Sequence, residues 1–152
     1  YFISLICLQT YSAYSALIKN MLYLIFLGKI LLATLLGSVL GWQRHHMGKA
    51  AGARTYALVT FGSTLFTMLS YSITNGDPGR IAAQIITGIG FIGAGTIIHK
   101  KDSIDGLTTA AGLWAASAIG MAVGFGWYFQ AIIASVLMFI ILAIKNVKNK
   151  WH

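Results

Sequence analysis

Five long apolar segments alternate with short polar segments along the chain. Each is close to the length, about 17 to 25 residues, that a helix needs to cross the hydrocarbon core of a bilayer. In lipid a helix satisfies all of its backbone hydrogen bonds within one segment. The pattern therefore predicts an all-α integral membrane protein, a bundle of about five transmembrane helices over residues 22–41, 55–73, 78–98, 107–124 and 127–144.

The third apolar segment is rich in glycine. Residues 81–98 carry no charge and contain Gly88, Gly90, Gly93 and Gly95. Each glycine disfavours a helix in water by about 1 kcal/mol relative to alanine, but in lipid it lets a neighbouring helix approach closely. We therefore expect this segment to be the central helix of the bundle.

Residues 88–93 also match G-x-G-x-x-G, the pattern of dinucleotide-binding loops. That pattern has meaning only where a strand turns into a helix, with an acidic residue about 20 positions further on. Here it lies within an apolar run, and the next carboxylates, Asp102 and Asp105, are too near. The glycines are therefore interpreted as helix-packing residues.

The fourth apolar segment carries small residues at every fourth position, namely Gly112, Ala116, Gly120 and Gly124. Residues four apart share one face of a helix, and small residues on one face favour close packing of helices in membranes. This row matches the glycines of the third segment, so we expect these two helices to pack closely.

The third segment begins with Asp77, Pro78 and Arg80. Aspartate is a favoured helix N-cap and proline is favoured at the first helical position, and the spacing lets Asp77 and Arg80 pair. Arg80, Gln84 and Thr87 share one helix face. Polar groups that enter a membrane usually face the bundle interior, so we interpret this stripe as a contact between helices, with a binding role as the alternative.

The segment 42–54 is polar and holds two adjacent histidines, His45 and His46. Metal sites need more ligands and other ligand types than this pair provides, so we interpret the segment as a loop at the phospholipid headgroups. Lys29 lies within the first apolar segment. We expect its side chain to extend towards the nearer interface, with a buried functional lysine as the alternative.

Composition and charge agree with membrane insertion. Charged residues make up 9% of the chain and the mean hydropathy is +0.76, whereas soluble domains have about 25% charged residues. The net charge is +8. The positive-inside rule explains this charge without a nucleic-acid partner. It places the segments 42–54 and 99–106 and the basic tail 145–152 in the cytoplasm, which fits a bacterial plasma membrane.

Residues 1–20 are an N-terminal extension of uncertain status. They are only moderately apolar, and the first methionine is Met21. Our hypothesis is that the extension lies upstream of the natural start, and an additional spanning or interfacial helix is the alternative. The one cysteine, Cys7, cannot form a disulfide within the chain.

Several motifs, in this order, resemble those of the MgtC/SapB family of bacterial membrane proteins. The resemblance covers residues 22–144 and includes Gly52-Ala53-Arg54-Thr55, Asp77-Pro78-x-Arg80-Ile81-Ala82-Ala83-Gln84, the glycine-rich residues 88–95, Gly106-Leu107-Thr108-Thr109-Ala110-Ala111 and Leu113-Trp114. It marks as functional candidates Arg44, Arg54, Thr55, Asp77, Pro78, Arg80, Gln84, Thr108, Thr109 and Trp114.

The chain departs from the family pattern at two places. Gln43 stands where the family tends to have glutamate, so a carboxylate that would pair with a basic residue or bind a cation is missing. Longer members have a soluble C-terminal domain that resembles ACT domains, and this chain looks like the short form because eight residues follow the last predicted span.

The resemblance implies a regulator of adaptation to low magnesium and of survival in host cells. Some members bind and restrain the F-type ATP synthase, so a partner membrane complex, or a second copy, is expected. The family is also described as a magnesium transporter, which is our alternative. Mg²⁺ prefers oxygen ligands such as carboxylates, and all three aspartates lie outside the predicted spans or at their ends.

An intramembrane enzyme is a third possibility. Ser63 and Ser117 lie in predicted spans, whereas all four histidines lie in polar segments. A serine nucleophile needs an adjacent base, so we expect no enzymatic activity, and no cofactor or metal site is expected.

Overall fold

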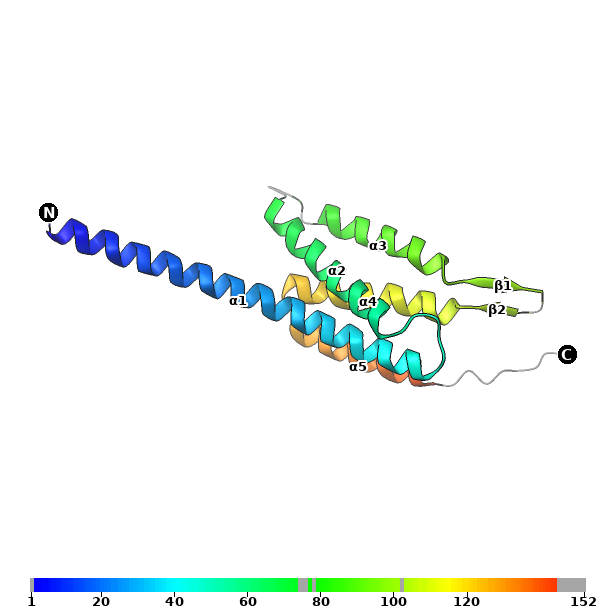
Figure 1. Ribbon diagram of the computed structural model, residues 1–152. Helices are drawn as coiled ribbons and strands as arrows, with labels where there is room; N and C mark the ends of the chain where they lie inside the picture. Colours follow the sequence, from blue (N-terminus) through cyan, green and yellow to red (C-terminus); the bar gives the residue numbers. More distant parts are fainter. Residues whose placement is uncertain (1, 74–76, 78, 102, 145–152) are drawn as a thin grey trace.

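In its described residues, the chain forms five helices and one two-stranded hairpin in the computed structural model (Figure 1). The structure describes residues 2–73, 77, 79–101 and 103–144, with side chains from Tyr14 onward. The five helices confirm the predicted all-α class. The elements are α1 (Phe2–His46), α2 (Ala53–Ile73), α3 (Gly79–Ala94), β1 (Ile98–Lys100), β2 (Ser103–Asp105), α4 (Leu107–Phe125) and α5 (Tyr128–Ala143).

Two helices in the described part of the chain are long and apolar enough to cross a membrane, as judged by length and composition. They are the Tyr14–His46 part of α1 and the whole of α4. The shorter helices α3 and α5 are also apolar. The basic tail 145–152 lies outside the described residues.

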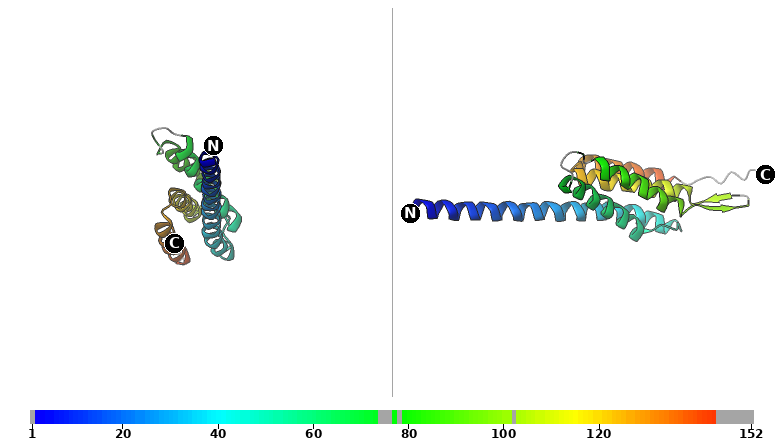
Figure 2. Two further views of the ribbon diagram at one scale, coloured as in Figure 1. Left: turned by 90° about the vertical axis from the view of Figure 1, so that its left-hand side faces the viewer. Right: turned by 90° about the horizontal axis from the view of Figure 1, so that it is seen from above.

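Helix α1 is much longer than the predicted first span. It has 45 residues, which correspond to about 67 Å at 1.5 Å per residue. Residues 2–20 are therefore the beginning of this helix and form no separate sixth one. The predicted loop over residues 42–54 is also wrong at its start, because Trp42–His46 still belong to α1. The N-terminal half of α1 projects beyond the bundle (Figure 2).

Helix α2 lies at the centre of the bundle, between α1 and α4, whereas the sequence predicted that α3 would (Figure 1). A methyl group placed on Gly41 of α1 would lie 2.6 Å from the Cα atom of Ala53. On the other side of α2, a methyl group on Gly124 of α4 would lie 2.6 Å from Cβ of Thr67. Both neighbours therefore contact α2 through their backbones.

Helices α3 and α4 pack against each other as predicted, but the small-residue row of α4 faces α2 and not α3. Gly112 lies against the hydroxyl of Tyr56, and Gly120 lies against the carbonyl oxygen of Thr60. The reason is that α2 presents short hydroxyl side chains on the facing side. Thr64 donates a hydrogen bond to the carbonyl of Gly120 at 2.7 Å.

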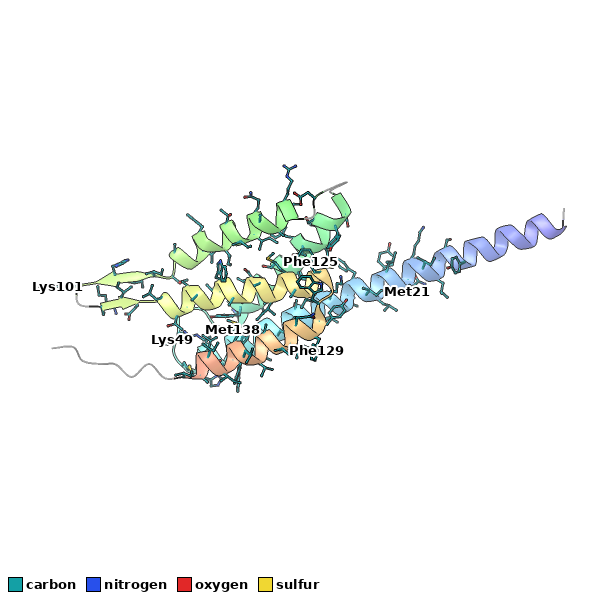
Figure 3. The ribbon with its side chains drawn as sticks, turned by 180° about the vertical axis from the view of Figure 1, so that it is seen from behind. Met21, Lys49, Lys101, Phe125, Phe129 and Met138 are labelled. Atoms are coloured by element: carbon teal, nitrogen blue, oxygen red, sulfur yellow. The ribbon has the colours of Figure 1, made fainter. Side chains whose placement is uncertain are left out.

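Two other buried hydroxyls of α2, those of Thr60 and Thr67, bond within their own helix. Thr60 donates to the carbonyl oxygens of Tyr56 at 3.1 Å and Ala57 at 3.0 Å, and Thr67 donates to Ser63 at 2.7 Å. The hydroxyl side chains of α2 therefore form hydrogen bonds within α2 and also to α4. Buried apolar residues complete the core, including Leu40, Leu113, Ala116, Ile119, Val123 and Met138, the last labelled in Figure 3.

Helix α3 lies at the side of the bundle and ends earlier than the predicted span of residues 78–98. It has 16 residues, about 24 Å, and it ends where Thr96 donates from both its backbone N–H and its hydroxyl to the carbonyl of Gly93, at 3.0 and 2.8 Å. The chain then enters β1, which pairs antiparallel with β2 from Ile98↔Asp105 to Lys100↔Ser103. The predicted loop 99–106 is thus largely a hairpin.

The glycines of α3 have different surroundings. A methyl group on Gly93 would lie 3.6 Å from Cβ of Ala110 in α4, so this glycine packs between helices as predicted. The atoms nearest to a methyl group on Gly95 belong to its own helix, and a methyl group on Gly88 or Gly90 would meet no neighbouring atom within 4 Å. Of these four glycines, Gly93 alone lies against a neighbouring helix in the described part of the chain, so the predicted helix-packing role is wrong for Gly88, Gly90 and Gly95.

Substitution of Gly120 tests the central position of α2. Gly120→Ala places a methyl group against the Thr60 carbonyl, and overpacking of this kind costs about 1–3 kcal/mol. We expect a lower midpoint of thermal unfolding in detergent, followed by circular dichroism. Gly28→Ala is the control, because no atom lies within 4 Å of that position. Equal midpoints for both variants would contradict the packing described here.

Candidate functional site

A buried cluster of polar side chains lies at the end of the bundle that carries the hairpin. Arg44, in the last turn of α1, is only 2% exposed, and its Nη2 donates a hydrogen bond to Oγ1 of Thr109 in α4 at 3.3 Å. Tyr56 of α2 is fully buried beside the charge of Arg44. Gln43 donates from Nε2 to the carbonyl of Phe139 in α5 at 3.0 Å. We call these four residues, Gln43, Arg44, Tyr56 and Thr109, the Arg44 cluster.

The charge of Arg44 has no counter-charge in the described part of the chain, where no carboxylate lies within ion-pair distance of it. Arg44 Nε, Gln43 Oε1 and the Tyr56 hydroxyl are buried without a hydrogen-bond partner there. Burial of an unpaired charge costs several kcal/mol. The carbonyl end of α1 offsets part of this cost, typically about 0.3–1 kcal/mol. The cluster offers donors to an acceptor, but it contains no nucleophile–base pair.

The structure corrects the prediction that Arg44 lies in a headgroup loop, because Arg44 is inside the bundle. Of the two predicted threonines, Thr109 points inward to Arg44 whereas Thr108 is exposed. Trp114 is 52% exposed on α4, so it does not belong to the cluster.

Arg54 and Thr55 lie apart from the cluster, at the mouth of a groove between α2 and α3. The groove has a volume of about 680 Å³. Two glycines, Gly62 of α2 and Gly88 of α3, leave open space along it. The groove is lined by Arg54, Thr55, Leu58, Val59, Gly62, Ser63, Phe66, Ile81, Gln84, Ile85, Gly88, Ile89 and Ile92.

The polar stripe of Arg80, Gln84 and Thr87 is exposed on α3, so the prediction that it faces the bundle interior is wrong. Phe91, one turn further along, is 85% exposed. A shallow hollow of about 500 Å³ lies over Arg80, Ile81, Ala83 and Gln84. In this chain α3 therefore presents an uncovered face that combines polar and aromatic side chains. We call it the outer face of α3.

Asp77 has the predicted N-cap role. Its Oδ1 accepts a hydrogen bond from the backbone N–H of Gly79 at 2.8 Å, which satisfies one of the free donors at the start of a helix. Among the described residues, Asp77 forms no ion pair with Arg80. The backbone N–H of Arg80 instead donates to the carbonyl oxygen of Asp77. Pro78 lies outside the described residues.

Lys29 and His46 both bond to backbone carbonyl oxygens. Lys29 is half-buried and donates to the carbonyl oxygen of Gly124 at 2.8 Å, so it bonds within the bundle, towards the C-terminal end of α4. His46 bonds through Nδ1 to the carbonyl of Trp42 at 3.0 Å. Among the described residues, no group of three or more His, Cys, Asp or Glu residues is placed to hold a metal ion.

Tyr56 is the main member of the Arg44 cluster that the sequence did not single out. A signal was present, because Tyr56, Thr60, Ser63 and Thr67 repeat a hydroxyl at helical spacing along α2. That row indicated a polar face on α2. It did not show that Arg44, twelve residues before Tyr56 and in the last turn of α1, would lie beside it.

Comparison with known proteins identifies the class of this bundle. Residues 30–151 match the model of the MgtC family. An uncharacterised protein of Haemophilus influenzae is 41% identical over 140 residues, 85% of this chain and 59% of that protein. The Escherichia coli protein described as putative magnesium transporter YhiD is 41% identical over 128 residues, 78% of this chain and 60% of that protein.

Protein MgtC of Salmonella typhimurium is 40% identical over 120 residues, 79% of this chain and 52% of that protein. The chain thus belongs to the MgtC family, as its motifs indicated. It spans between half and three fifths of the length of these relatives. None of the three names indicates an enzymatic activity. No solved structure matches the chain.

Thr109 provides a test of the Arg44 cluster. Thr109→Val removes the hydroxyl that accepts from the buried guanidinium, and a hydrogen bond to a charged group contributes about 1.5–3 kcal/mol. We expect a clear loss of unfolding free energy in detergent. Thr108→Val is the matched control because the neighbouring side chain is exposed. A similar loss in both variants would show that the hydrogen bond to Arg44 does not contribute to the free energy of unfolding.

Proposed function

We propose that this chain is a non-enzymatic, multi-pass protein of a bacterial plasma membrane that regulates another membrane complex by binding it. The observation that carries the proposal is the outer face of α3. It combines exposed Phe91, a polar stripe along the same helix, and Gly90, where an added methyl group would meet no neighbouring atom within 4 Å. In a membrane, small residues let a partner helix approach, and polar side chains hydrogen-bond to it.

Charge supports the orientation that goes with this proposal. Lys49, in the connection between α1 and α2, and Lys101, in the hairpin, lie at the same end of the bundle (Figure 3). Basic residues collect on the cytoplasmic side of membrane proteins. The hairpin end therefore faces the cytoplasm in our proposal, and the turn before α3 faces outward.

The family resemblance suggests the partner. The F-type ATP synthase is the complex to test first, with restraint of ATP synthesis during growth at low magnesium as the role. Transport of magnesium or another cation is the alternative, because one relative bears the name of a putative magnesium transporter. Ligand chemistry favours the regulator, since Mg²⁺ prefers carboxylates and Asp77 and Asp105 are exposed at helix or strand ends.

Photocrosslinking tests the docking face. A photoreactive phenylalanine analogue at Phe91, in the full chain in its native membrane, should crosslink to a subunit of another membrane complex, identified by mass spectrometry. The same analogue at Phe129 is the control, because that residue of α5 is also well exposed, at 73%. Crosslinks to the same proteins from both positions, or from neither, would contradict docking through α3.

Magnesium flux tests the alternative. We expect purified chain in proteoliposomes to give no saturable Mg²⁺ uptake, because no carboxylate lies within a predicted span. An entrapped fluorescent indicator measures the uptake, and protein-free liposomes give the background. Saturable uptake that depends on the protein would contradict the regulator proposal and support transport.

A further inference from the structure

The groove between α2 and α3 has the length of one membrane leaflet. Arg54 lies at one end of its α2 wall and Phe66 at the other. These positions are about 18 Å apart along a helix, and half of the hydrocarbon core is about 15 Å thick. The groove therefore begins at the hairpin end of the bundle and reaches about the middle of a bilayer.

The groove has a volume of about 680 Å³ and is lined mainly by apolar side chains. The open space depends on glycine, because Gly62 and Gly88 each have no atom within 4 Å of a methyl group placed on them.

The mouth of the groove differs in chemistry from its walls. Its walls are mainly Leu, Val, Ile and Phe side chains, whereas the mouth carries the exposed guanidinium of Arg54 and the hydroxyl of Thr55. No carboxylate pairs with Arg54 among the described residues. A guanidinium binds phosphate oxygens through two parallel hydrogen bonds. Lys49 and Lys101 add positive charge at the same end (Figure 3).

We propose that this groove binds an anionic phospholipid, with an acyl chain between α2 and α3 and the phosphate on Arg54 and Thr55. The proposal rests on the membrane placement proposed above, and it places the lipid in the leaflet at the hairpin end. The acyl chain fills the space beside Gly62 and Gly88, so it supports α3 on the side that faces α2. The position of α3 then depends on the lipid composition of the membrane.

Native mass spectrometry of the purified full chain tests this site. Phosphatidylglycerol and phosphatidylcholine with identical acyl chains are titrated in detergent. We expect the wild-type chain to bind phosphatidylglycerol at least tenfold more tightly. Arg54→Gln should remove this preference while an acyl chain still binds, and Arg54→Lys should retain part of it. Gly88→Leu should reduce binding of both lipids at least tenfold, because its side chain occupies the groove.

Two control variants separate a defined site from general attraction. Gly90→Leu adds the same side chain to the same helix outside the groove lining, and Lys101→Gln removes a charge from the hairpin. Both should bind lipid like the wild type. Loss of the preference in Lys101→Gln equal to that in Arg54→Gln would overturn the proposal, because diffuse charge would then explain it. Unchanged binding by Gly88→Leu would also overturn it.

A photoreactive residue at Phe66 gives an independent readout. It should label phospholipid, whereas a crosslink to a second copy or to another protein would show that a helix occupies the groove and would overturn the lipid site. Circular dichroism and membrane fractionation of each variant establish that it is folded and inserted. The Phe91 crosslink tests the docking face separately. A negative result for the lipid site therefore does not change the interpretation of that crosslink.

Discussion

Backbone contact on both sides of α2 is the constraint on which the rest of the structure depends. Gly37 and Gly41 bring α1 against α2, and Gly112, Gly120 and Gly124 bring α4 against its other side. These contacts are so close that a single methyl group on most of these glycines would overlap a neighbouring atom. Hydroxyl side chains fill the remaining space, and Thr64 ties α2 to α4 by a hydrogen bond. Three helices are thereby fixed, whereas α3 rests on their side.

The Arg44 cluster depends on this arrangement. Arg44 reaches Thr109 only because α1 and α4 both lie close to α2, and the Tyr56 hydroxyl takes the space beside Gly112. A buried arginine without a carboxylate partner is costly, and its neighbour Gln43 is an uncharged amide. The cost falls on the end of the bundle that carries the basic loop and the hairpin. The close packing on α2 therefore also fixes the position of the buried polar groups at this end of the bundle.

Local signals in the sequence predicted local structure well. Asp77 was predicted as an N-cap from its neighbours alone, and its bond to Gly79 is local. Helix α4 begins at the predicted residue, Leu107, because Gly106 takes a left-handed conformation there. The choice of partners was predicted poorly. A row of small residues indicates close packing, but it does not say which helix packs there. Arg44 likewise read as a loop residue, because its partner is 65 positions away.

The length of α1 gives this protein a mechanical property. The N-terminal half of α1 is an arm that projects beyond the bundle (Figure 2), and Lys29, further along the helix, bonds to the end of α4. A continuous helix without proline transmits bending along its axis. The hydrogen bond of Lys29 attaches this arm to the bundle at the end of α4. A tilt of this arm is therefore transmitted along α1 to Gly37 and Gly41, where α1 contacts the central helix.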